Sequence, residues 1–201
     1  AAPTVVPIEA GRLSDHIRIL SSDAFEGRAP ATAGETKSVD YITAQFKALG
    51  LKPGGKDGSW TQPVKLNRFT ITRPVVASLS LNGWSRALVD GDDVVLGSRR
   101  PSAGVHVVSA PLVFVGYGVH APERGWDDFK GMDMHGKIMV VLVNDPDFEM
   151  AKPGAFDGKA MTYYGRWTYK YEEAARQGAA AAIIIHDTPG AAYGWDVVKS
   201  S

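Results

Sequence analysis

The sequence predicts an α+β protein in which helices come first and a β-rich domain follows. Three observations lead to this fold class. Apolar residues recur at helical spacing in the first 50 residues, and from about Trp60 onward they alternate at the period of a strand. A strand, a helix and a second strand then follow one another after residue 136. We therefore expect an N-terminal helical segment at 1–66 and a second domain at 67–201, with a mixed sheet, hairpins and a βαβ unit.

The most clearly delimited helix is expected to begin after Thr32. The run Thr32-Ala33-Gly34-Glu35 fits a capping box, in which the threonine hydroxyl and the glutamate carboxylate each satisfy a free backbone amide. Gly50 and Pro53 supply the stop. The apolar stripe between them is Val39, Ile42, Phe46 and Leu49, and a weaker stripe precedes it at Leu13, Ile17 and Leu20. Either the two stripes pack together, or they pack on something outside this chain.

Strands are expected through the middle of the chain. Ala77, Leu79 and Leu81 alternate with smaller or polar residues and lead into Asn82-Gly83, a dipeptide that tolerates the positive φ angles of a tight hairpin turn. The segment 137–143 is apolar on both faces and predicts a central strand. Further strands are expected at 105–108, 112–117 and 136–144.

A βαβ unit is expected near the end of the chain. A helix is predicted from about Arg166 to Gln177 and ends at Gly178, and a buried strand follows at 181–186. Together with the strand at 136–144, this order predicts a right-handed crossover between parallel strands.

Composition and charge argue against several function classes. Lysine plus arginine and aspartate plus glutamate each total 22, and neither sign forms a run, so nucleic acid and membrane surfaces are not expected partners. No apolar stretch approaches the roughly 20 residues that cross a bilayer, which predicts a soluble protein. Cysteine is absent, which excludes disulfides and cysteine-ligated zinc. The opening Ala1-Ala2-Pro3-Thr4 resembles the residues left by signal peptidase and predicts an exported protein, periplasmic or extracellular.

The histidines do not form a metal-binding pattern. The five are at least 14 residues apart, and none belongs to a His-x-Asp, His-x-His or His-Glu-x-x-His element. The densest polar cluster contains His120, Glu123, Asp127 and Asp128, but Pro122, Gly125 and Trp126 interrupt it as a turn-bearing loop would. We therefore predict no metal ligand and no cofactor in this chain. If zinc were bound, His120, Glu123 and Asp127 would be the first residues to mutate.

Three other motifs are weak signals for catalysis. Glu172-Glu173 suggests a general base beside a metal, but adjacent helical residues point about 100° apart, and Lys170 and Arg176 are placed for surface ion pairs. The neighbours Ser14-Asp15-His16 cannot form a catalytic triad within one helix. Gly116-Tyr117-Gly118 lacks the third glycine of a dinucleotide-binding loop. No catalytic residue is predicted.

The segment 162–171 is the strongest candidate for ligand contact. It places five aromatic residues and two cations at the expected start of a helix, where backbone amides favour an anion such as a substrate carboxylate. We predict Tyr164 and Arg166 as substrate-binding residues. In the alternative interpretation the segment is structural, with Trp167, Tyr171 and Ala174 packing the helix onto the sheet.

Several motifs together resemble a known family. The run Leu20-Ser21-Ser22-Asp23-Ala24-Phe25-Glu26-Gly27-Arg28, with the later Leu49-Gly50-Leu51-Lys52-Pro53, is similar to the opening of the bacterial zinc aminopeptidases of metallopeptidase family twenty-eight. Four later runs resemble the protease-associated domain inserted in those enzymes: 114–118 (Phe-Val-Gly-Tyr-Gly), 125–129 (Gly-Trp-Asp-Asp-Phe), 136–144 and 172–180.

The resemblance implies the front portion of an exported aminopeptidase that uses two zinc ions. It places 1–66 in the peptidase domain and makes 67–201 a protease-associated domain. Nothing in this chain matches the family's ligand or general-base motifs, so the chain alone is expected to be inactive. Its implied partners are the catalytic domain of the same polypeptide and a peptide substrate. The alternative is a free-standing peptide- or protein-binding module.

Overall fold

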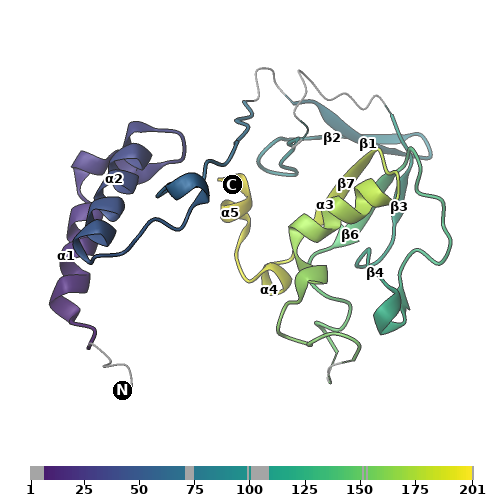
Figure 1. Ribbon diagram of the computed structural model, residues 1–201. Coiled ribbons are helices and arrows are strands. Elements are labelled where there is room, and N and C mark those ends of the chain that lie inside the picture. Colours follow the sequence, from purple (N-terminus) through teal and green to yellow (C-terminus); the bar gives the residue numbers. More distant parts are fainter. Residues whose placement is uncertain are drawn as a thin grey trace. The chain divides into compact units, whose positions relative to one another are not determined.

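The computed structural model describes residues 7–70, 75–98, 100, 109–150, 152 and 154–200. Contacts between Cα atoms divide the chain into two compact units, Ala1–Leu66 and Asn67–Ser201. Each unit is described below by itself (Figure 1).

The first unit is helical. It contains α1 (Ala10–Leu20), η1 (Asp23–Arg28), α2 (Ala33–Ala48) and η2 (Lys56–Gly58). Thr32 caps α2 as predicted, because its hydroxyl accepts a hydrogen bond from the amide of Glu35. The Glu35 carboxylate accepts from the amide of Ala31, one residue before the position that a capping box uses.

The first unit has almost no interior. Among its described residues, only Gly34 is buried, where its Cα lies close to the backbone of η1. His16 of α1 and Tyr41 of α2 share a hydrogen bond of 2.7 Å. The apolar stripes stay open: Ile17 is 58% exposed and Phe46 is 45% exposed. These helices therefore do not bury their stripes against each other.

The second unit opens with the predicted hairpin. Strands β1 (Ala77–Leu81) and β2 (Trp84–Leu88) pair antiparallel, with Leu81 opposite Trp84. Asn82 and Gly83 have φ angles of 48° and 83°, as a two-residue turn of this kind requires. The prediction from Asn82-Gly83 is confirmed.

Gly83→Ala is expected to lower the free energy of unfolding by about 1 kcal/mol. An added Cβ at this position would meet no atom within 4 Å, so the effect isolates the backbone strain of a positive φ. Gly97→Ala is the matched control, because its Cβ also meets nothing and its φ is not in the left-handed region. Urea denaturation of both variants measures the difference, and equal stabilities would contradict the prediction.

A three-stranded parallel sheet forms the centre of the second unit. Its order is β3 (Leu112–Phe114), β6 (Ile138–Leu142) and β7 (Ala181–Ile185). Helix α3 (Trp167–Arg176) connects β6 to β7 and lies across the sheet in Figure 1. The predicted βαβ unit is therefore confirmed, and β6 is the central strand as expected.

The main core lies between the sheet and α3. Met139 and Val141 of β6 are fully buried and pack with Ala174 of α3. The other residues of β6 alternate with them and are only half-buried, so the strand is covered less completely on its second face. The cluster comprises Val115, Phe129, Met134, Met139, Val141, Ala174 and Ala179.

The remaining elements are short: β4 (His120–Ala121), η3 (Pro122–Arg124), β5 (Trp126–Asp127), η4 (Tyr163–Gly165), α4 (Thr188–Ala191) and α5 (Trp195–Lys199). Strands β4 and β5 pair antiparallel in a sheet of their own, so parallel and antiparallel pairing fall in different sheets. The strand expected at 105–108 lies outside the described residues. The α+β class is confirmed.

The buried face of α3 differs from the expected one. Ala174 is buried in the core as expected, but Tyr171, also expected to pack on the sheet, is 45% exposed. The other buried residues of α3 are Tyr169, Lys170 and Glu173. Lys170 is therefore not a surface ion-pairing residue. Its ammonium donates to the carbonyl oxygens of Tyr117 and Asn144, and these backbone partners compensate its burial. Over the ranges that the structure describes, no helix is both long and apolar enough to cross a bilayer.

Candidate functional site

A surface pocket lies beside α3 and has a volume of about 460 Å³. Its walls come from β4, η4 and α3, all in the second unit. We call it the tyrosine pocket because three tyrosines line it. Its lining residues are His120, Tyr163, Tyr164, Tyr169, Glu173, Arg176 and Gln177.

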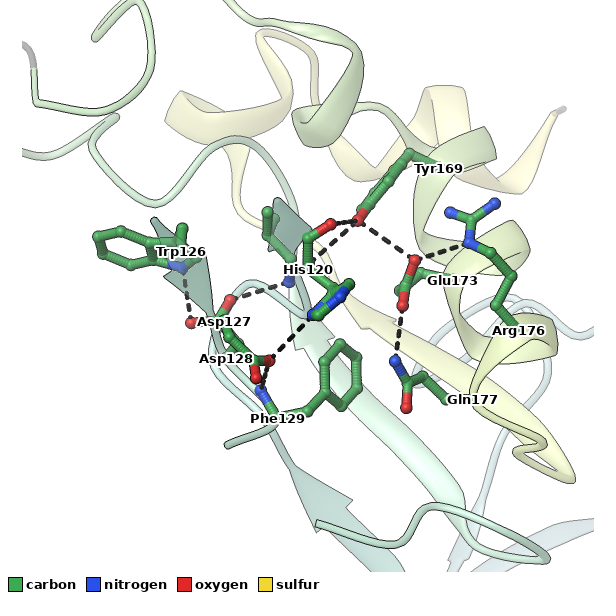
Figure 2. Close-up of polar contacts among 10 residues, drawn as sticks. His120, Trp126, Asp127, Asp128, Phe129, Tyr169, Glu173, Arg176 and Gln177 are labelled. Carbon is green, nitrogen blue, oxygen red and sulfur yellow. Dashed lines mark hydrogen bonds and ion pairs between the residues drawn. The ribbon is translucent and has the colours of Figure 1, made fainter. Parts of the chain in front are cut away.

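Tyr169 attaches α3 to strand β4 (Figure 2). Its hydroxyl oxygen lies 3.1 Å from the amide nitrogen of His120 and 3.3 Å from the carbonyl oxygen of the same residue. The ring is only 4% exposed. Burial raises the pKa of Tyr169 to about 12, because the phenolate would lose its hydration. Tyr169 therefore stays a neutral hydroxyl that holds the backbone of His120 in the pocket wall.

Glu173 connects the other α3 side chains of the pocket wall by hydrogen bonds. It is one helical turn from Tyr169 and Gln177, and its side chain is buried. Its carboxylate accepts hydrogen bonds from Arg176 Nε at 2.8 Å and from Gln177 Nε2 at 2.8 Å (Figure 2). The Arg176 guanidinium also lies over the ring of Tyr169, 5.3 Å from its centroid. Glu173 is thus a fixed structural charge, not the surface residue expected from the sequence.

The rim of the pocket pairs two tyrosine hydroxyls with two exposed carboxylates. Tyr163 donates to Glu172 at 2.8 Å, and Tyr164 donates to Glu123 at 2.5 Å. These bonds raise the pKa of both tyrosines, since each hydroxyl proton is held by a carboxylate. The bond from Tyr164 also lowers the pKa of Glu123, because it stabilises the ionised form.

Tyr164→Phe is expected to raise the pKa of Glu123 toward its ordinary value, because the variant removes the hydrogen bond that contributes most to the shift. Side-chain carboxyl chemical shifts followed by NMR through the acid range measure this pKa. Tyr163→Phe is the matched control, because that hydroxyl bonds Glu172 instead. A Glu123 pKa that moves equally in both variants would show that the bond to Tyr164 is not the cause.

The loop around His120 is held by its acidic residues. Asp127 Oδ1 lies 3.4 Å from His120 Nδ1 and also accepts from the amide of Phe129. Burial opposes ionisation of Asp127, but these hydrogen bonds outweigh it and lower the pKa. Asp128 accepts from the amide of Val119 and from Trp126 Nε1 (Figure 2).

These side chains do not fit a zinc ion. Glu123 is turned toward Tyr164 and Asp128 toward Trp126, so neither converges with His120 and Asp127. Within the described ranges, no group of three histidine or acidic side chains is arranged to hold a metal.

The structure separates the two residues predicted to bind substrate. Tyr164 lines the tyrosine pocket. Arg166 is exposed at the residue that precedes α3, and it is not part of the pocket wall. A substrate-binding role for either residue stays a prediction.

Sequence reasoning missed most of the pocket wall. The residues Tyr169, Glu173 and Gln177 are spaced by four along α3, which is the available signal that they share one face. The sequence groups His120 only with its neighbours, whereas Tyr169, whose hydroxyl bonds the His120 backbone, is 49 positions away.

Residues 108–200 match the family model of the PA domain, the protease-associated domain. This part of the chain is a PA domain. Comparison with curated proteins and with solved structures finds no match. The PA domain contains the parallel sheet, α3 and every residue of the tyrosine pocket.

Proposed function

We propose that this chain supplies the non-catalytic N-terminal and PA portion of an exported di-zinc exopeptidase, an aminopeptidase. In this proposal the PA domain covers the active-site cleft and assists substrate selection. The match of residues 108–200 to the PA domain carries the proposal. The resemblance of residues 20–28 and 49–53 to the opening of zinc aminopeptidases supports the nature of the parent enzyme.

The small interior of the first unit supports the proposal that a further domain packs against it. With Gly34 as its single buried residue among those described, it has too little interior to be stable alone. Exposed apolar residues on α1 and α2 are suited to packing against a sheet. We assign 1–66 to the peptidase domain, and we assign the two zinc ions to ligands outside this chain.

A free-standing peptide- or protein-binding module is the second candidate. The tyrosine pocket favours it, because aromatic side chains with polar tips are typical of peptide-binding surfaces. This candidate needs no catalytic domain, whereas the first one does.

One experiment tests catalysis and binding on the same sample. The purified chain is incubated with zinc and unlabelled tri- and tetrapeptides. Mass spectrometry follows hydrolysis, and amide chemical shifts of residues 163–177 follow binding. We expect no hydrolysis and saturable shifts at the tyrosine pocket. Hydrolysis would overturn the non-catalytic assignment, and the absence of any binding would overturn a direct role in substrate selection.

The two candidates differ in what the gene encodes. His-x-Asp and Glu-Glu elements encoded in frame downstream of this chain would support the exopeptidase parent. A natural protein limited to these residues would instead support the free-standing module.

A further inference from the structure

We propose that the tyrosine pocket recognises a primary ammonium group of a peptide, carried either by a lysine side chain or by the α-amino terminus. This inference rests on the peptide-binding function proposed above and names the chemical class of its ligand. Charge, hydrogen-bonding capacity and aromatic lining support it independently.

The charge around the pocket is negative. Four carboxylates gather at its wall and rim, and two guanidinium groups face them. The carboxylates belong to Glu123, Asp127, Glu172 and Glu173, and the guanidinium groups belong to Arg124 and Arg176. Two negative charges remain in excess, and protonation of His120 would neutralise only one of them. A cationic ligand is therefore favoured over an anionic one.

The two arginines are already engaged within the protein. Arg124 donates to the carbonyl oxygen of Ala155 and lies over the rings of Phe156 and Tyr164. Arg176 donates to Glu173 and lies 3.6 Å from Glu172. Both guanidinium charges already face carboxylates, that of Glu123 for Arg124 and those of Glu172 and Glu173 for Arg176, so they are balanced before a ligand arrives.

The rim presents acceptors to a ligand. Tyr163 and Tyr164 use their hydroxyl protons on Glu172 and Glu123, so each hydroxyl offers only oxygen lone pairs toward the pocket. An ammonium group has three donors and no acceptor, and it complements this arrangement. A ligand carboxylate, which has only acceptors, would face these lone pairs and the excess negative charge, and its donors would have to come from His120, Arg176 or Gln177.

The aromatic lining suits a cation on an aliphatic stem. The ring of Tyr169 is edge-on to Tyr164 at 4.9 Å and to Tyr163 at 5.8 Å, measured between centroids. Arg124 already lies over the ring of Tyr164 and Arg176 over that of Tyr169. The ring of Tyr163 is 52% exposed and offers an aromatic surface against which the methylene groups of a cationic side chain can pack. The pocket volume of about 460 Å³ lies in the range of small-molecule sites.

The test is an NMR titration of the full chain with four small probes. N-acetyl-lysine methylamide carries only a side-chain ammonium, and glycine methylamide carries only an α-ammonium. N-acetyl-norleucine methylamide is the neutral match for lysine, and N-acetyl-glutamate methylamide is the anionic probe. We expect saturable shifts at residues 163–177 with at least one ammonium probe. Its dissociation constant should be at least tenfold lower than that of the norleucine or glutamate probe. The ammonium probe that binds identifies the source.

A charge-removing variant tests the cause. The double variant Glu123→Gln/Glu172→Gln keeps an acceptor for each tyrosine but removes both exposed charges, and we expect it to weaken ammonium binding at least fivefold. The control Asp92→Asn/Asp196→Asn makes the same change in net charge at exposed positions outside the pocket wall, and we expect it to bind as the parent chain does.

The outcomes distinguish failure of the ammonium inference from failure of the proposed peptide binding. If norleucine binds as tightly as lysine, or if the two double variants behave alike, the ammonium inference fails while peptide binding stands. If no probe and no peptide produces shifts, both the inference and a direct binding role fail.

Discussion

Asp147→Ala is expected to lower the free energy of unfolding by about 3 kcal/mol. The carboxylate of Asp147 is 1% exposed and accepts hydrogen bonds from three backbone amides, those of Gly154, Phe156 and Gly158. Alanine leaves all three donors without their acceptor inside the folded protein. Loss of a single buried partner typically costs 1 to 3 kcal/mol.

Two further variants separate this cause from a general effect of charge. Asp147→Asn keeps the size of the side chain but places an amide donor beside the backbone donors, so we expect it to be destabilising as well. Asp157→Ala removes an exposed carboxylate from the same loop and is expected to change stability by less than about 0.5 kcal/mol. Urea denaturation followed by tryptophan fluorescence measures all three. A stable Asp147→Ala protein would mean that water replaces the carboxylate without loss.

Lys170→Met is expected to destabilise the fold by about 3 kcal/mol at neutral pH. The Lys170 side chain is fully buried, and its ammonium lies 2.6 Å from the carbonyl oxygen of Tyr117 and 3.0 Å from that of Asn144. These carbonyls follow the ends of β3 and β6, so Lys170 connects α3 to both strands. Methionine fills the volume but supplies no donor, and it removes the positive charge near buried Asp145.

The same residue predicts how stability depends on pH. Burial lowers the pKa of Lys170 from 10.5 to about 8, although Asp145 and Asp128 oppose the shift. Between these values the unfolded chain holds a proton that the folded chain has released. The contribution of Lys170 therefore makes the free energy of unfolding rise with pH, by about 2 kcal/mol from pH 8 to pH 10. Well below pH 8 both states are protonated, and this contribution is constant.

Tyr169 reverses the trend at higher pH. Its pKa is raised from 10 to about 12, so between these values the folded chain keeps a proton that the unfolded chain has lost, and stability falls. Urea denaturation at pH 7 to 11 should show a rise followed by a fall in the parent chain. In Lys170→Met the rise should be absent and the fall retained. A rise of the same size in both proteins would show that another group is responsible.

The candidate site was only partly predictable. The aromatic segment 162–171 identified Tyr164, which lines the tyrosine pocket, and also Arg166, which does not. By residue type, Tyr164 and Arg166 are equally plausible as ligand contacts. Only one of them lines the pocket, because nearby positions at the start of a helix point in different directions. The rest of the wall depends on α3 lying against β4, a contact between residues distant in the sequence.

The α+β class, the hairpin at Asn82-Gly83 and the strand–helix–strand order followed from the sequence by itself. These features arise from turn chemistry and apolar periodicity, which neighbouring residues set among themselves. Only the tertiary structure decided that Lys170, Asp147 and Glu173 are buried, and that His120 and Tyr169 share a pocket wall. The physical reason is that a charged side chain is buried only where the fold places hydrogen-bond partners around it, as it places the carbonyls of Tyr117 and Asn144 around Lys170. No local sequence pattern predicts where such partners will lie.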